Sequence, residues 1–124
     1  MAVNKIHSFT DLDTWRQAHN LVLMTYKFTE KFPIKETYSL IDQMRRCVIS
    51  ITSNIAEGFS RRGKKEKIQF YFMAKGSLTE LQNQLLVARD VGYLKKEDFD
   101  TLATQTVHVH KLLNGLIRSS EAKY

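Results

Sequence analysis

Apolar residues recur every three or four positions along four stretches of the chain, and no stretch alternates in the manner of a β-strand. Spacings of three, four and seven residues place side chains on one face of an α-helix. The pattern therefore predicts four amphipathic helices, over residues 11–31, 35–60, 64–90 and 95–119. The clearest apolar seam belongs to the second helix and is formed by Ile41, Met44, Val48, Ile51, Ile55 and Phe59.

The connections between these helices are short and are marked by turn-forming residues. Pro33 ends the first helix, because its ring removes a donor and disfavours helical backbone at the preceding residue. Gly63 is expected to end the second helix in a left-handed conformation, with Gly58 as the other candidate. Gly92 follows the third helix. Short links place successive helices side by side and antiparallel, so the expected fold is all-α: one up-down-up-down four-helix bundle over residues 1–124.

Composition narrows the class of protein without giving a function. With 124 residues, 26% charged and 43% apolar, the chain is long enough for one folded domain. No apolar run approaches the roughly 20 residues of a membrane span, and the first residues lack the apolar stretch of a secretory signal. We therefore expect a cytoplasmic protein with no membrane partner. Cys47 is the single cysteine, and His108 and His110 diverge by about 200° on a helix, so neither a metal site nor a cofactor is expected.

A polar stripe runs beside the apolar seam of the second helix. Its members lie three or four residues apart: Arg46, Ser50, Ser53 or Asn54, Glu57 and Arg61. One hypothesis makes Glu57 a general base and Arg46 an anion holder. The favoured interpretation is a hydrogen-bonded ion ladder that fixes which helices pair. No Ser-His-Asp or Cys-His set supports catalysis, and Cys47 is expected to be a small core residue. We therefore assign no catalytic residue and expect no enzyme.

The third helix contains a glycine, Gly76, in its middle. A glycine there costs about 1 kcal/mol relative to alanine, which indicates close approach of another helix backbone. Ser77 and Glu80 are expected to form hydrogen bonds across that contact. The expected structural polar network consists of Arg46, Ser53, Asn54, Glu57, Ser77 and Glu80.

Two stretches carry a family resemblance: Ser53-Asn54-Ile55-Ala56-Glu57-Gly58-Phe59 followed by Arg61-Arg62, and Ala74-x-Gly76-Ser77-Leu78-x-Glu80-Leu81. With further motifs they make the chain, over roughly residues 8–118, resemble the bacterial "four helix bundle protein" family. That family is similar to the intervening-sequence protein encoded within 23S ribosomal RNA genes. The resemblance implies a homopentameric barrel associated with RNA and no established catalytic residues. Thr52 departs from the family, in which proline is common.

A more distant resemblance connects the chain to the accessory variability determinant of diversity-generating retroelements. That protein partners a reverse transcriptase, which adds such an enzyme to the possible protein partners.

Positive charge is concentrated in one segment of a chain whose net charge is +6. Residues 61–67 hold five basic residues and one acid. In an antiparallel bundle this segment shares one end with Lys5, Arg118 and Lys123. The functional hypothesis is contact with RNA phosphates through Arg61, Arg62, Lys64, Lys65 and Lys67. The alternative is a solvated basic loop that keeps the protein soluble.

Some apolar residues fall outside the seams. On the third helix they include Ile68, Phe72 and Leu86, and on the first helix Leu21, Met24 and Phe28. Contiguous apolar residues outside a core mark a contact surface. We predict a cyclic homo-oligomer whose interface contains Leu21, Phe28, Ile68, Phe72 and Leu86.

Three functions compete at this stage. The first is a non-enzymatic, homo-oligomeric protein that binds structured or ribosomal RNA through its basic end. The alternative is an interaction scaffold or accessory subunit, for example of a reverse transcriptase, with no RNA affinity of its own. A third and weaker reading is a small hydrolase that uses Glu57.

Overall fold

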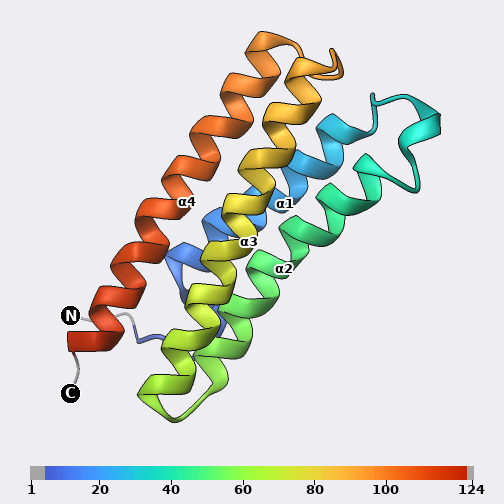
Figure 1. The fold of residues 1–124 in the computed structure, drawn as a ribbon. Coiled ribbons are helices and arrows are strands. Elements are labelled where there is room, and N and C mark those ends of the chain that lie inside the picture. The colour runs from blue at the N-terminus through green and yellow to red at the C-terminus, as the bar shows by residue number, and fades with distance from the viewer. Residues whose placement is uncertain (1–4, 123–124) are drawn as a thin grey trace.

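The computed structural model describes residues 5–122 and is helical over most of that range. Its helices are α1 (Asp13–Thr29), α2 (Leu40–Ser60), α3 (Lys64–Asp90) and α4 (Lys96–Ala122), with short 3-10 turns η1 (Phe9–Asp11) and η2 (Ile34–Glu36). No strand occurs among the described residues, which confirms the all-α class. The long helices lie side by side (Figure 1).

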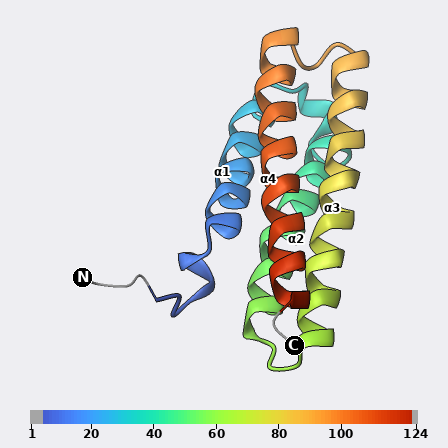
Figure 2. The same cartoon turned by 90° about the vertical axis from the view of Figure 1, so that its left-hand side faces the viewer.

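Each long helix packs against two others. α1 and α3 both contact α2 and α4. The α2–α3 connection and the end of α4 lie at one end of the molecule, and the α1–α2 and α3–α4 connections lie at the other (Figures 1 and 2). This arrangement brings the first turn of α3 close to the C-terminal turn of α4, where Lys64, Lys65 and Glu121 line one pocket. None of the helices within residues 5–122 has an apolar stretch sufficient to cross a membrane.

One hydrophobic core fills the space between the four helices. The seam predicted on α2 is confirmed from Ile41 to Ile55, because Ile41, Met44, Val48, Ile51 and Ile55 are buried, whereas Phe59 is only partly buried against this core. α3 contributes Tyr71, Ala74, Leu78, Leu81 and Leu85, and α4 contributes Leu102, Val109, Leu113 and Ile117. Burying one large aliphatic side chain contributes about 1.5–3 kcal/mol, so this core supplies the main favourable free energy of folding.

Leu21 was predicted to lie at the interface between subunits. Its side chain is instead fully buried in this core, where a second subunit cannot contact it. The buried face of α1 includes Leu21, Thr25 and Thr29. Burial of the two threonines is possible because each hydroxyl donates to the carbonyl four residues earlier, Leu21 and Thr25 respectively.

The helix boundaries differ from the predicted ones mainly at α2, which begins at Leu40 rather than at 35. Residues 34–36 form η2 instead. The Glu36 carboxylate accepts hydrogen bonds from the Ser39 hydroxyl at 2.5 Å and the Tyr93 hydroxyl at 2.8 Å. Both contacts hold Glu36 outside a continuous helix. The bounds of α3 are those predicted.

Gly92 follows α3 as predicted, whereas Gly63 and Gly76 do not act as predicted. Gly63 is extended, with φ −76° and ψ 133°, and precedes α3, so its expected left-handed conformation is wrong. Among residues 5–122 only Gly92 has a positive φ, of 89°. Gly58 lies inside α2, where a Cβ would meet Tyr71 Cε1 at 2.7 Å. Gly76 has no such neighbour within 4 Å. The expected close helix approach therefore occurs at Gly58, and its expected position at Gly76 is wrong.

Candidate nucleic-acid interface and polar cluster

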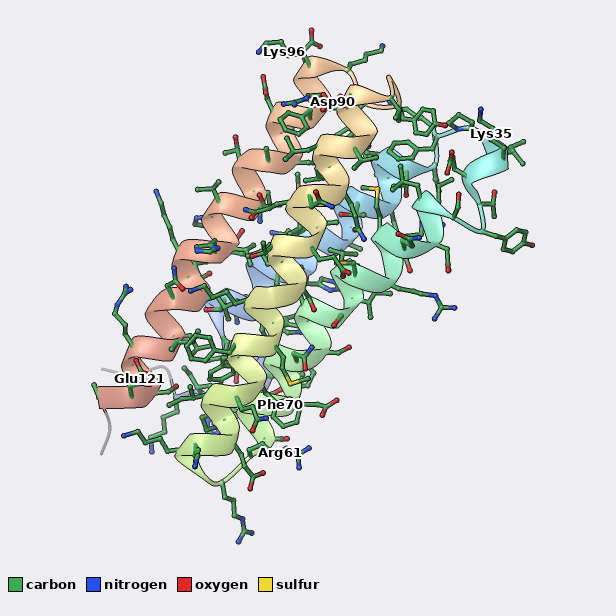
Figure 3. The ribbon with its side chains drawn as sticks, viewed as in Figure 1. Lys35, Arg61, Phe70, Asp90, Lys96 and Glu121 are labelled. Atoms are coloured by element: carbon green, nitrogen blue, oxygen red, sulfur yellow. The ribbon has the colours of Figure 1, made fainter. Side chains whose placement is uncertain are left out.

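The positive residues between α2 and α3 lie at one end of the molecule, where Figure 3 labels Arg61. Arg62 and Lys65 are exposed to solvent. Arg61 is also exposed, but its Nη2 lies 3.5 Å from Glu57 Oε2 and its guanidinium carbon 4.8 Å from the Phe70 ring centroid. These two contacts orient the Arg61 guanidinium without removing it from solvent.

Lys67 has a different role from the one predicted. Its Nζ donates to the carbonyl oxygens of Gly58 at 2.9 Å and Phe59 at 2.8 Å. The last carbonyls of a helix lack partners within that helix and carry partial negative charge, so an ammonium stabilises them. Lys67 is a capping residue of α2, and we remove it from the candidate phosphate contacts.

Other parts of the chain join this basic end. Lys64, Lys65 and Ile68 of α3 line a surface pocket together with Glu121 of α4. Arg118 is exposed one turn before Glu121. Lys5 is exposed next to Ile6, which lines a pocket with Lys67 and Tyr71. Lys123 lies outside the described residues. We call Arg61, Arg62, Lys64 and Lys65 the basic end.

The opposite end of the molecule carries no such excess. Residues 30–36 hold two basic and two acidic residues, and residues 89–100 hold three basic and four acidic ones. Figure 3 labels Lys35, Asp90 and Lys96 there, with charges of both signs. The excess of positive charge therefore lies at one end of the long axis of the molecule.

The predicted buried ion ladder on α2 does not form. Arg46 Nε pairs with Asp42 at 3.1 and 3.0 Å, and the Arg46 side chain is 80% exposed. Glu57 pairs with Arg61 in solvent, and Ser53 is exposed. Both ion pairs join residues four positions apart along the chain and are open to solvent. Exposed pairs of this kind contribute little to stability, so the structural role expected of Arg46, Ser53 and Glu57 is corrected.

A smaller polar cluster lies between α2 and α3 instead. Ser50 Oγ and Ser77 Oγ are 2.9 Å apart, and Asn54 Nδ2 donates to the Ser50 carbonyl at 2.8 Å and to its hydroxyl at 3.1 Å. The Cys47 thiol donates to the Ser77 carbonyl at 3.0 Å. We call Cys47, Ser50, Asn54 and Ser77 the polar cluster. Asn54 and Ser77 take part as predicted, although Gly76 makes no close contact.

Cys47 is buried, as expected of a small core residue. Burial first, and then the adjacent Glu80 carboxylate, raises the pKa of the thiol to about 12. A thiol with that pKa stays protonated at neutral pH and is a poor nucleophile. The cluster therefore has the character of a structural contact between helices.

The contacts of Arg45 and His19 and the burial of Gln84 were not predicted from the sequence. Arg45 joins α1 to α2: its Nε donates to Thr29 Oγ1 at 3.1 Å, and its guanidinium carbon lies 4.5 Å from the Tyr26 ring centroid. Gln84 is buried on α3 beside the polar cluster. His19 stacks on Trp15 with ring centroids 4.7 Å apart. Within residues 5–122 no three His, Cys, Asp or Glu side chains gather to hold a metal ion.

The model of one protein family, described as 23S rRNA-intervening sequence protein, matches residues 10–115. The chain belongs to this family. The match includes the basic end, the polar cluster and both motifs that carried the resemblance, which is thereby confirmed. No curated protein sequence matches the chain.

A solved structure with the same fold comes from Bacteroides thetaiotaomicron VPI-5482 and is described as a protein of unknown function from the S23 ribosomal protein family. It is 19% identical, with a TM-score of 0.74, over 84% of this chain and 97% of that chain. At 19% identity, the similarity shows that the two proteins share a fold. It does not show that they share a function.

Proposed function

We propose that this protein is a non-enzymatic, homo-oligomeric, cytoplasmic protein that binds structured RNA through the phosphates. The observation that carries the proposal is the gathering of Arg61, Arg62, Lys64 and Lys65 at one end, opposite an end with balanced charge. The family description, which names 23S rRNA, supports RNA as the polyanion.

The chemistry of the basic end favours phosphates over bases. Guanidinium and ammonium groups bind phosphate oxygens and release condensed counterions, which gives affinity without reading sequence. Base stacking requires exposed aromatic faces, whereas Phe70 lies beneath the Arg61 guanidinium. We therefore expect affinity that depends strongly on salt and weakly on sequence.

Filter binding of a structured fragment of ribosomal RNA tests the proposal. The variant replaces Arg61, Arg62, Lys64 and Lys65 with glutamine. The matched control replaces four lysines of the opposite end, Lys31, Lys35, Lys95 and Lys96, which are all exposed. We expect the first variant to lose at least about tenfold in affinity and the control to lose much less. Equal affinities in the two variants would contradict the proposal.

Self-association is supported by apolar side chains on the outer face of α3. Phe72, Met73, Leu86 and Val87 are exposed there, and Val107 of α4 is exposed beside them. Leu86, Phe99 and Val107 line an apolar groove of about 160 Å³. Exposed apolar area of this kind is typical of a contact surface, and closed cyclic symmetry is the usual way to cover it. The family resemblance suggests five subunits.

Phe28 and Ile68 contribute less than predicted to this surface. Both are half-buried and pack against the subunit's own core. Phe72 and Leu86 remain the candidate interface residues from the sequence.

The opposite end supports the alternative of an interaction scaffold. Ile34 is 89% exposed and Tyr38 is 93% exposed in the connection between α1 and α2. Such residues suit docking of another protein, for example a reverse transcriptase. Co-purification of one specific protein, together with no RNA affinity of the purified chain, would favour this alternative.

A further inference from the structure

A pocket of about 260 Å³ lies between the helices at the same end of the molecule as the basic end. Its apolar walls come from three parts of the chain: Ile6 and Leu12 before α1, Phe59 at the end of α2, and Leu116 of α4. Pockets for drug-sized ligands measure roughly 300–1,000 Å³, so this one suits a smaller group, such as a single ring. None of the four residues of the basic end lines it, and the phosphate contacts proposed above make no use of it.

The hydroxyl of Tyr71 faces this pocket without a partner. Tyr71 of α3 lines the pocket and is 1% exposed, and no residue among 5–122 forms a hydrogen bond with its Oη. Within that range, Gln84 Oε1 is the one side-chain oxygen or nitrogen that is both unpaired and inaccessible to solvent, so the Tyr71 hydroxyl is accessible. The pocket is the only described opening that Tyr71 lines. A bound group can therefore donate to this hydroxyl or accept from it.

The other polar side chains of the pocket favour an uncharged occupant. Ser119 is exposed on α4, and the Ser120 hydroxyl donates to the Leu116 carbonyl at 2.9 Å, which leaves its oxygen able to accept. The Lys67 ammonium already donates to two carbonyls at the end of α2. None of the lining side chains is acidic. A charged group buried here would meet no dedicated counter-charge, whereas hydroxyls serve a neutral group that carries both donors and acceptors.

One face of α3 leads from the basic end to this pocket. Lys64, Lys67 and Tyr71 lie three and four residues apart, so their side chains are neighbours along that face. A phosphate that contacts Lys64 is thus within two helical turns of the Tyr71 hydroxyl. A nucleotide held by its phosphate at the basic end can direct its base toward the pocket.

We infer that this pocket receives one unpaired pyrimidine base of the RNA whose phosphates the basic end contacts. The inference rests on the proposed RNA binding and adds to it a preference for a bulged nucleotide. A base is flat and uncharged, its faces suit the apolar walls, and its edge carries donors and acceptors that the hydroxyls match. Unpaired bases enter a pocket at little cost, because they need not leave a base pair. The small volume favours the single ring of a pyrimidine over a purine.

Filter binding of two RNA hairpins that differ at one position tests this site. One hairpin carries a single bulged uridine in its stem, and the other carries an abasic residue there, which keeps every phosphate. We expect wild type to bind the uridine hairpin about tenfold more tightly. Equal affinity for the two hairpins overturns the inference and leaves phosphate binding at the basic end intact. Binding of neither hairpin removes the proposed function as well.

Two variants locate the preference in this pocket. Tyr71→Phe keeps the ring and removes the hydroxyl, so we expect the preference for uridine to fall at least about threefold while affinity for the abasic hairpin is unchanged. Tyr38→Phe, an exposed tyrosine at the far end, is its control. Ser119→Trp covers the pocket from an exposed position on α4 and should abolish the preference, whereas Thr101→Trp, exposed near the other end of α4, should keep it.

Circular dichroism melts verify that each variant folds, and affinity for the abasic hairpin verifies that its basic end is intact. A full preference for uridine in both Tyr71→Phe and Ser119→Trp overturns the inference.

Discussion

Gly58 of α2 lies directly against the ring of Tyr71 of α3, where a Cβ would be 2.7 Å from Cε1 and 2.9 Å from Cδ1. Tyr71 is itself buried, with 1% of its surface exposed, so the surrounding core holds its ring in this position. The missing side chain of Gly58 is thus what allows α2 and α3 to approach at this level.

We predict that Gly58→Ala destabilises the protein although alanine favours helix. Overpacking a core costs about 1–3 kcal/mol, and contacts of 2.7 and 2.9 Å place Gly58→Ala in the upper part of that range, above the roughly 1 kcal/mol that alanine gains in helix propensity. Gly76→Ala is the control: nothing lies within 4 Å of that position, so we expect a gain of roughly 1 kcal/mol. Urea unfolding in a Phe72→Glu background measures both without a contribution from subunit contacts. Changes of the same sign at the two glycines would contradict the packing role of Gly58.

The polar cluster, and not the exposed ion pairs, should carry the polar contribution to stability. Ser50→Ala leaves the Ser77 hydroxyl without its partner and removes one acceptor from the Asn54 amide, which we expect to cost about 1–2 kcal/mol. Arg46→Met breaks only a solvent-exposed pair with Asp42 and should change the melting temperature by less than about 2 °C. Thermal melts followed by circular dichroism compare the two. A larger effect of Arg46→Met would restore the buried ladder that the sequence suggested.

Stability should fall at alkaline pH because of two buried acids. Burial raises the pKa of Tyr71 from an ordinary value of 10.0 to about 12, and burial together with Glu80 raises that of Cys47 from 9.0 to about 12. Between those values the unfolded chain has lost protons that the folded chain keeps, so stability decreases as pH rises. Below an ordinary pKa of 9.0 neither group contributes a slope. Urea midpoints across this range measure the effect.

Two variants show which residue causes the loss of stability at alkaline pH. Cys47→Ala should reduce the loss of stability from about pH 9 upward, whereas Tyr71→Phe should reduce it only from about pH 10 upward, because the ordinary pKa values of the two groups are 9.0 and 10.0. A decline of unchanged size in the double variant would show that other groups cause it.

The sequence correctly predicted the features that depend on the spacing of residues within one helix. The buried seam from Ile41 to Ile55 follows from apolar spacing alone, and the bounds of α3 follow from that spacing together with Gly63 and Gly92. Leu21 was misplaced because hydrophobicity does not count Thr25 as a core residue, although its hydroxyl is satisfied within α1. Lys67 was wrongly predicted to contact phosphate, because a lysine in the sequence shows a positive charge but not where the side chain points. Its ammonium group donates to carbonyl oxygens at the end of α2.

Assembly should depend on the outer face of α3. Phe72→Glu places a charge where an apolar side chain is 50% exposed, and we expect it to dissociate the oligomer while helical circular dichroism is retained. Tyr38→Glu is the control, because Tyr38 is an exposed aromatic residue in the connection at the far end. Light scattering should give several times 14.4 kDa for wild type and Tyr38→Glu, and the subunit mass for Phe72→Glu. A monomeric wild type would refute the oligomer.

RNA affinity should depend on assembly even when every basic residue is kept. In a ring whose subunits point the same way, each basic end lies on one rim, so a single RNA reaches several copies at once. Linked contacts raise overall affinity well beyond that of one contact, and the slope of log affinity against log salt grows with the number of phosphates neutralised. Phe72→Glu should therefore weaken RNA binding and flatten that slope, whereas Tyr38→Glu should change neither. Filter binding at several salt concentrations measures both quantities. An unchanged slope in a variant shown to be monomeric would mean that one subunit makes all the phosphate contacts, and RNA binding would then not require the ring.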